Sequence, residues 1–169
     1  FQTNCNRWLH DAEHGELQEY THGRAENARV SGGRLRITAV REPFAGQNFT
    51  SARLHTHGKG DWRYGRVEVC AKLPAHARGL WPAIWLLPSE RRYGEWPTAG
   101  DTDICEHVGW QPRGQLHASV HTQRYNHRAQ SQVRASTVVA SAHDRFHVYA
   151  LEWRHDGLRV FVDNVCFGV

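Results

Sequence analysis

The sequence predicts an antiparallel all-β protein, a sandwich or barrel of the jelly-roll kind. Apolar and polar residues alternate with a two-residue period in many short stretches, and turn-forming residues separate these stretches. No segment carries an apolar stripe with the 3.6-residue period of a helix. Closely spaced strands of this kind are typical of jelly rolls. Because 169 residues amount to one domain, we expect a single domain over residues 1–169.

Eight stretches carry this alternation. In chain order they are 34–40 (RLRITAV), 51–56 (SARLHT), 64–73 (YGRVEVCAKL), 83–87 (AIWLL), 101–108 (DTDICEHV), 116–121 (LHASVH), 146–153 (FHVYALEW) and 158–162 (LRVFV). Gly-rich breakers separate most of them, at 31–33, 58–60, 94–100 and 109–114. The tripeptide His155-Asp156-Gly157 predicts a hairpin between the last two strands.

Charge and hydropathy limit the partners. The net charge of +4 comes from 21 basic and 17 acidic residues, and the basic residues are spread along the chain, which argues against a nucleic-acid partner. No apolar run reaches the roughly 18–20 residues that a membrane-spanning helix needs. The chain contains no Met and no leader sequence, so we expect a processed or excerpted piece of a protein. Neither nucleic acid nor membrane is therefore an expected partner.

Cysteines and histidines do not predict a metal site. The four cysteines stand far apart without a CxxC pair, which leaves their disulfide pairing open and argues against structural zinc. Among the 13 histidines, His55 with His57 and His117 with His121 would share a strand face. Because no HExxH motif or neighbouring carboxylate set accompanies them, we expect no metal.

Three carboxylates stand within six residues of an otherwise apolar strand, at Asp101, Asp103 and Glu106. A regular strand would direct Asp101 and Asp103 to one face and Glu106 to the other. A β-bulge at Ile104 or Cys105 would bring all three to one face, where two carboxyl groups can act as nucleophile and general acid/base of a retaining glycosidase. The alternative is an exposed strand face with three solvated acids.

Tryptophans surround this acidic strand in the sequence. Trp81 and Trp85 precede it, Trp96 lies in the intervening loop and Trp110 follows it. Indole rings stack on the apolar faces of sugars, so tryptophans beside paired carboxylates predict a carbohydrate cleft, and Trp81 and Trp85 would share a face of a regular strand. Core positions are expected for the other tryptophans, Trp8, Trp62 and Trp153.

These residues resemble those of family-16 glycoside hydrolases, and within that family the bacterial laminarinase-type endo-1,3-β-glucanases. The likeness covers nearly the whole chain in consistent order. It rests on the acid motif after Gly100 and on the segments 51–56 (SARLHT), 65–74 (GRVEVCAKLP), 79–88 (GLWPAIWLLP), 146–153 (FHVYALEW) and 160–164 (VFVDN). The resemblance implies a concanavalin A-like jelly-roll sandwich and a secreted, monomeric hydrolase of β-glucan that retains the anomeric configuration and needs no cofactor.

The resemblance also implies roles for single residues. Asp101 falls on the nucleophile, Asp103 on the helper and Glu106 on the acid/base of the family's acid motif. Positions along the sugar-binding groove are implied for Asn48, Arg53, Trp81, Trp85, Trp110, His121 and Asn126.

Two departures from the family pattern matter. The nucleophile position of the family holds Glu, so the carboxylate of Asp101 is one methylene short. The family's chain also extends beyond both ends of this one, so we expect a partial domain whose sandwich lacks terminal strands. A catalytically impaired β-glucan-binding module of the same fold is therefore the alternative. The linkage of the substrate stays open between 1,3, mixed 1,3/1,4 and sulfated galactan.

Overall fold

The computed structural model describes residues 2–3, 16–90 and 92–168, and these residues form strands, turns and irregular segments without a helix. The chain divides into two compact units, an N-terminal unit of residues 1–61 and a C-terminal unit of residues 62–169. This division into units does not test the expectation of a single domain, which stays a prediction. Trp8 and Cys5, which the sequence singled out, lie outside the described residues.

The N-terminal unit consists of short strands. They are β1 (Gln2–Thr3), β2 (Gln18–Tyr20), β3 (Ala28–Ser31), β4 (Arg34–Ile37), β5 (Val40–Phe44), β6 (Gln47–Ser51) and β7 (Leu54–His55). They form a three-stranded sheet in the order β2-β6-β5 and two pairs, β1 with β7 and β3 with β4. Fully buried Asn27 and Thr50 hold this unit together, because the Asn27 amide donates to the Thr50 hydroxyl and that hydroxyl donates to the carboxylate of Glu42.

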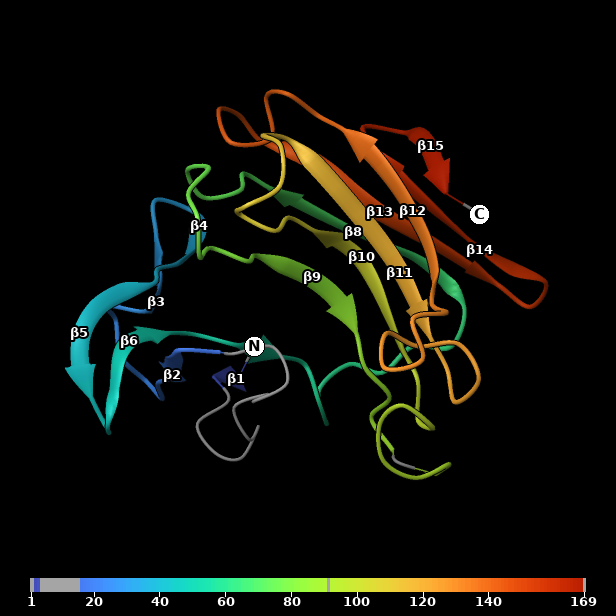
Figure 1. Ribbon diagram of the computed structural model, residues 1–169, viewed down its shortest axis with the longest axis horizontal. Coiled ribbons are helices and arrows are strands. Elements are labelled where there is room, and N and C mark those ends of the chain that lie inside the picture. Colours follow the sequence, from blue (N-terminus) through green and yellow to red (C-terminus); the bar gives the residue numbers. More distant parts are fainter. Residues whose placement is uncertain (1, 4–15, 91, 169) are drawn as a thin grey trace. The chain divides into compact units, whose positions relative to one another are not determined.

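The C-terminal unit consists of two antiparallel four-stranded sheets (Figure 1). Its strands are β8 (Gly65–Ala71), β9 (Ala83–Leu86), β10 (Asp101–Glu106), β11 (Gln115–His121), β12 (Val133–Val138), β13 (His147–Arg154), β14 (Gly157–Val162) and β15 (Val165–Gly168). One sheet has the order β12-β11-β10-β9 and is called the carboxylate sheet below, because β10 carries the three acids. The second sheet has the order β15-β14-β13-β8.

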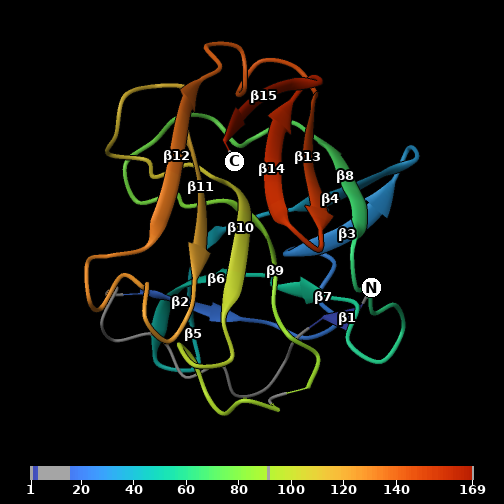
Figure 2. The same cartoon turned by 90° about the vertical axis from the view of Figure 1, so that its right-hand side faces the viewer.

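The core of this unit lies between the two sheets, which Figure 2 shows as two sets of neighbouring strands. Its buried side chains alternate along the strands with side chains that point away from the core. The carboxylate sheet contributes Ile104, Cys105, Leu116 and Ala118. The second sheet contributes Tyr149, Leu151, Val160 and Val162. Burying each large apolar side chain stabilises the fold by about 1.5–3 kcal/mol, so this core fixes β10 and β11 against the second sheet.

The structure confirms most of the predicted strands in the C-terminal unit. The stretches 64–73, 83–87, 101–108, 116–121, 146–153 and 158–162 coincide with β8, β9, β10, β11, β13 and β14 to within a few residues. The predicted hairpin also forms, because Arg154 of β13 pairs with Gly157 of β14. In the N-terminal unit the stretch 34–40 divides between β4 and β5, and 51–56 between β6 and β7. The sequence did not predict β1, β2, β3, β12 or β15.

One predicted core residue is wrong. Trp62 is 60% exposed, because it lies in an irregular segment before β8 rather than on the alternating face of a strand. Trp153 packs against the core, as predicted. Cys70, Cys105 and Cys166 are free thiols, so the described cysteines form no disulfide with one another.

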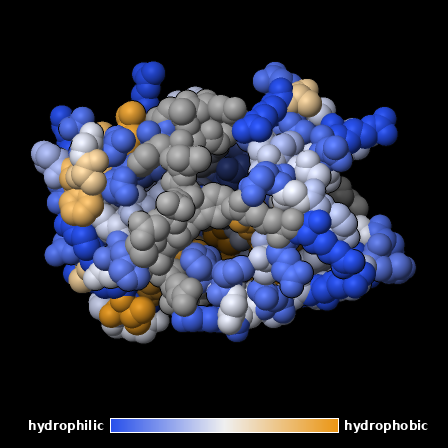
Figure 3. All heavy atoms as spheres, turned by 90° about the horizontal axis from the view of Figure 1, so that it is seen from below, coloured by the Kyte–Doolittle hydropathy of each residue, from blue (hydrophilic) through white to orange (hydrophobic). Residues whose placement is uncertain are grey.

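The large exposed apolar side chains are scattered over many elements. On the face seen in Figure 3 they form separate orange patches among hydrophilic residues. Single apolar residues on a surface are common in folded proteins. Within the described residues, the structure has no helix with the length and apolarity that a membrane crossing requires.

Candidate active site

A β-bulge interrupts β10 in the middle of the acid motif. Towards β11, Asp103 pairs with Ser119 and Glu106 pairs with His117, so two residues of β10 stand against one residue of β11. The register towards β9 shifts at the same place. The two residues inside the irregularity are both 1% exposed and both belong to the core, Ile104 and Cys105. This arrangement confirms the predicted bulge.

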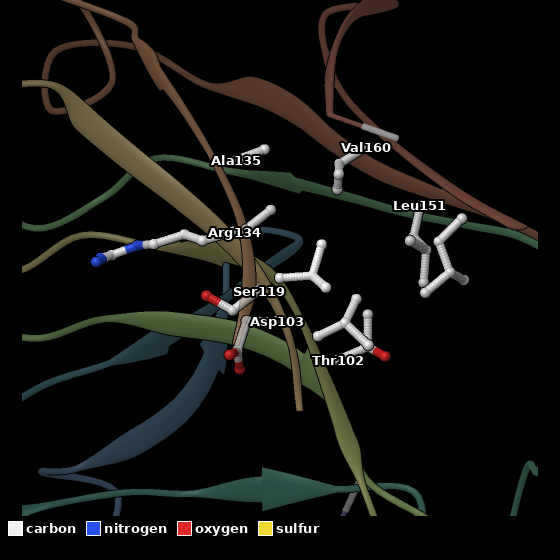
Figure 4. Close-up of a pocket in the computed structure, with 11 residues that line it drawn as sticks. Thr102, Asp103, Ser119, Arg134, Ala135, Leu151 and Val160 are labelled. Atoms are coloured by element: carbon white, nitrogen blue, oxygen red, sulfur yellow. The ribbon is translucent and has the colours of Figure 1, made fainter. Parts of the chain in front are cut away.

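The bulge places the three carboxylates on one face of the carboxylate sheet. Asp101 pairs with His121 of β11. The partners of Asp103 and Glu106 lie two and four residues before His121 on the same strand. Side chains two and four residues apart on a regular strand share a face, so their cross-strand partners share it too. Figure 4 shows the Asp103 side chain on the side of the sheet opposite to Leu151 and Val160 of the second sheet. The acids therefore point away from the core.

Asp103 and His121 form a buried pair. Atom Nε2 of His121 lies 3.3 Å from Oδ2 of Asp103, and both side chains are at most 10% exposed. Burial lowers the pKa of His121, but the hydrogen bond to Asp103 and the charges of Asp101, Asp103 and Glu106 outweigh it and raise the pKa above its ordinary value. Atom Nε2 of His121 donates to Asp103 and so fixes its carboxylate.

Glu106 has a pKa suited to proton transfer. Burial and the neighbouring charge of Asp103 raise the pKa of Glu106 to about 7, although a hydrogen bond from Trp81 and the charges of Arg134 and His121 act in the opposite direction. The indole Nε1 of Trp81 donates to Oε1 of Glu106 over 2.9 Å. A general acid is most effective when its pKa lies near the working pH, so Glu106 can protonate a leaving group in neutral or mildly acidic solution.

The tryptophans predicted to flank the acids lie beside them. Trp85 of β9 is the cross-strand partner of Asp103, and Trp81 contacts Glu106 through the hydrogen bond above. Trp110 meets Trp81 edge to face with 5.8 Å between the ring centroids, and Trp110 is 64% exposed. Exposed and half-buried indole rings next to carboxylates provide the stacking surface that a sugar needs.

Trp96 has a different environment. Its ring stacks on His127 with 4.5 Å between centroids, lies 5.9 Å from the ring of His121 and also lies under the guanidinium of Arg128. These contacts join the loop after β9 to the loop after β11. Trp96 thus packs beside His121.

The other predicted binding residues are distributed differently. Asn126 is 4% exposed, and its side-chain amide donates to the carbonyls of Thr122 and Gln123 while its side-chain oxygen accepts from the amide of Ala129. Asn126 therefore shapes the loop after β11. Asn48, an exposed residue of β6, and half-buried Arg53, which follows that strand, belong to the N-terminal unit.

Two further residues on the acid face received no site role from the sequence. His117 pairs with Glu106, and its ring nitrogens contact the Ser136 hydroxyl at 2.8 Å and the Gln111 side-chain oxygen. Burial and nearby positive charges lower the pKa of His117 to about 4, so it is a neutral neighbour of Glu106. Arg134 of β12 pairs with Ser119 and points to the same face. Directly paired residues of neighbouring strands point to the same face, so both positions can be identified once the acid face is known.

Comparison with known proteins agrees with this geometry. A sequence model of the glycosyl hydrolases family 16 matches residues 16–168. A beta-glucanase of Rhodothermus marinus is 50% identical over 165 aligned residues, which cover 94% of this chain and 57% of the relative. A glucan endo-1,3-beta-glucosidase of Cryptopygus antarcticus is 36% identical over 172 aligned residues, covering 97% of this chain and 60% of the relative.

A solved structure shows the same fold. The X-ray structure of the laminarinase from Rhodothermus marinus matches with a TM-score of 0.91 at 46% identity, over 98% of this chain and 65% of that one. This match confirms the predicted jelly-roll fold. The chain spans less than two thirds of the length of these proteins.

Proposed function

The chain belongs to glycosyl hydrolase family 16, and from this premise we propose that it cleaves β-1,3-linked or mixed-linkage glucan internally, with retention of anomeric configuration. The observation that carries this proposal is the position of Glu106. Its carboxyl group has a pKa of about 7 and shares one strand face with two further carboxyl groups. Retaining glycosidases need two carboxyl groups flanking the bond, of which one carries a proton.

The proposed mechanism is a double displacement. Protonated Glu106 donates its proton to the glycosidic oxygen while Asp101 attacks the anomeric carbon and forms a covalent glycosyl ester. Glu106, now a carboxylate, removes a proton from water, and this water displaces Asp101 from the anomeric carbon. Trp81 holds one oxygen of Glu106 throughout, because its indole donates to Oε1.

Asp103 and His121 support the two reacting carboxyl groups, those of Glu106 and Asp101. The negative charge of Asp103 raises the pKa of Glu106 and so keeps the proton on it before cleavage. His121 fixes the Asp103 carboxylate through the contact of 3.3 Å. Trp85, beside Asp103, and Trp110, which packs on Trp81, supply two separate apolar surfaces for sugar rings, which favours a polymer substrate over a single sugar.

The setting of the reaction follows from the substrate. We propose a secreted enzyme, because a glucan polymer meets it outside the cell. All three carboxylates come from one strand of one chain, which supports a monomeric enzyme. The two-carboxylate mechanism uses no cofactor or metal.

The decisive experiment measures product and stereochemistry together. Laminarin is incubated with the protein, reducing ends are counted, and proton NMR records which anomer appears first. We expect oligosaccharides of several lengths with the β-anomer first, and loss of turnover in Glu106→Gln. The matched control is Asp156→Asn, an exposed acid in the β13–β14 turn, which should behave like the parent.

Two outcomes would contradict the proposal. Laminarin binding without turnover would favour the glucan-binding module instead. An α-anomer as first product would mean inversion and would remove Asp101 from the nucleophile role.

A further inference from the structure

A row of side chains crosses the carboxylate sheet at the level of Asp103. Trp85 of β9 pairs with Asp103, Asp103 pairs with Ser119 of β11, and Ser119 pairs with Arg134 of β12. Directly paired residues of antiparallel strands point to the same face. The row therefore presents, in order, an indole, a carboxylate, a hydroxyl and a guanidinium on the acid face.

We propose that Arg134 is a substrate-binding residue of this face and contacts a sugar unit at a distance from the cleavage point. This inference rests on the proposed function, because it assumes that the bound polymer is a β-glucan. It adds a position on the β12 side of the acids, opposite to Trp85.

The strand spacing sets how far this position lies from the chemistry. Neighbouring strands are about 4.8 Å apart, so Arg134 begins about 10 Å from Asp103 across the sheet. One strand spacing is comparable to the length of a pyranose unit. A glucan that crosses the strands would therefore place a unit beyond the cleaved residue within reach of the guanidinium.

The side chain of Arg134 is available for a ligand. It is exposed, and none of the described side chains forms a hydrogen bond or ion pair with it. In Figure 4 it extends from β12 on the same side as Ser119 and Asp103, while Ala135, the next residue, points towards the second sheet. A guanidinium carries five donors in a planar fork, which suits adjacent hydroxyl groups of one sugar.

A purely electrostatic role is the competing explanation. The charge of Arg134 lowers the pKa of Glu106, so its removal would affect the acid whatever the substrate. A binding contact depends on the length of the substrate, whereas an effect on Glu106 does not. Measurements at pH 5, well below a pKa of about 7, keep Glu106 protonated in every variant.

The test compares laminari-oligosaccharides of increasing length. Arg134→Met keeps much of the stem and removes the charge and all donors, and Arg134→Lys restores the charge without the fork. For substrates long enough to reach β12 we expect kcat/KM to fall about tenfold in Arg134→Met and less in Arg134→Lys, in line with the loss of a hydrogen bond from a charged donor. Shorter substrates should be unaffected. Arg159→Met, an exposed residue of β14 in the second sheet, is the control.

A binding arm separates this inference from the proposed function. Calorimetric titration with the same oligosaccharides is done on Glu106→Gln with and without Arg134→Met. Length-dependent weakening supports the inference even if the parent protein turns over no glucan, in which case only the proposed hydrolysis fails. An equal effect at all lengths, or no effect, overturns the role of Arg134 and leaves the hydrolysis standing. No binding to any oligosaccharide overturns both.

Discussion

Replacing Glu106 by Gln should stabilise the folded protein at pH 8 and leave its stability at pH 4 nearly unchanged. In the unfolded chain this carboxyl group ionises near its ordinary pKa of 4.5, and in the folded protein near 7. Between these values the native protein keeps a proton that the unfolded chain has lost, so the stability of the parent falls as pH rises through this window. Above it the loss is constant.

The size of the effect follows from the width of the window. Each pKa unit corresponds to about 1.4 kcal/mol, so a rise from 4.5 to about 7 removes about 3 kcal/mol from the free energy of unfolding at pH 8. Gln has no proton to lose, has nearly the same shape as the protonated acid, and can still accept the hydrogen bond from Trp81. The variant should therefore avoid this penalty.

The assay is urea unfolding of both proteins at intervals from pH 4 to pH 8, followed by tryptophan fluorescence. We expect the two free energies of unfolding to agree at pH 4 and to diverge by about 3 kcal/mol at pH 8. Charges common to both proteins cancel in the difference. A difference that stays constant with pH would show that Glu106 ionises like an exposed acid, and the reasoning that assigns it the proton would be wrong.

Three further predictions concern the surroundings of Glu106. Asp101→Glu should raise the turnover of laminarin, because one methylene extends the carboxylate by roughly 1.5 Å. Misplacement of a reacting group by about 1 Å can cost a hundredfold in rate. Unchanged turnover would argue against Asp101 as nucleophile. Trp85→Ala should weaken oligosaccharide binding in titrations about tenfold and shift the thermal midpoint little, since this ring is half-buried on the acid face; a collapsed transition would place the ring in the core. Gly109→Ala should lower stability by about 1–3 kcal/mol and also weaken glucan binding. An added Cβ would lie 2.0 Å from the backbone oxygen of Ala77, so the segment that leads to Trp81 must shift; unfolding curves and binding titrations identical to the parent would contradict this.

The sequence predicted the bulge in β10 because strand parity leaves a detectable signal. Asp103 and Glu106 are an odd number of residues apart, and only an irregular strand could bring both to one face. The apolar character of Ile104 and Cys105 predicted where the extra residue would go, and the register confirms it. Strong alternation likewise located β11, β13 and β14.

Other features left no such signal. Arg134 lies in a strand that the sequence did not predict, and only its pairing with Ser119 reveals that it faces the acids. His117 shares a predicted strand face with His121, but only its pairing with Glu106 reveals that it lies beside the acid. The segment that forms β6 is polar, and its place in a sheet depends on pairing with β2 and β5 rather than on its own pattern. Trp62 was misplaced because an aromatic residue next to a predicted strand does not indicate which way it turns.

The bulge in β10 means that the backbone register, and not the sequence spacing of the acids alone, sets the direction of Glu106. If β10 straightened at its present length, Glu106 would turn towards Tyr149 and Leu151. Deleting either Ile104 or Cys105 would instead leave Asp103 and Glu106 two residues apart and on one face of a regular strand. Exchanging Ile104 for another aliphatic residue would leave the orientation of Glu106 as it is. Genetic variation in this protein should therefore tolerate conservative substitutions at these two positions. Loss of one of them should remove the bulge and one core side chain while Glu106 stays opposite His117.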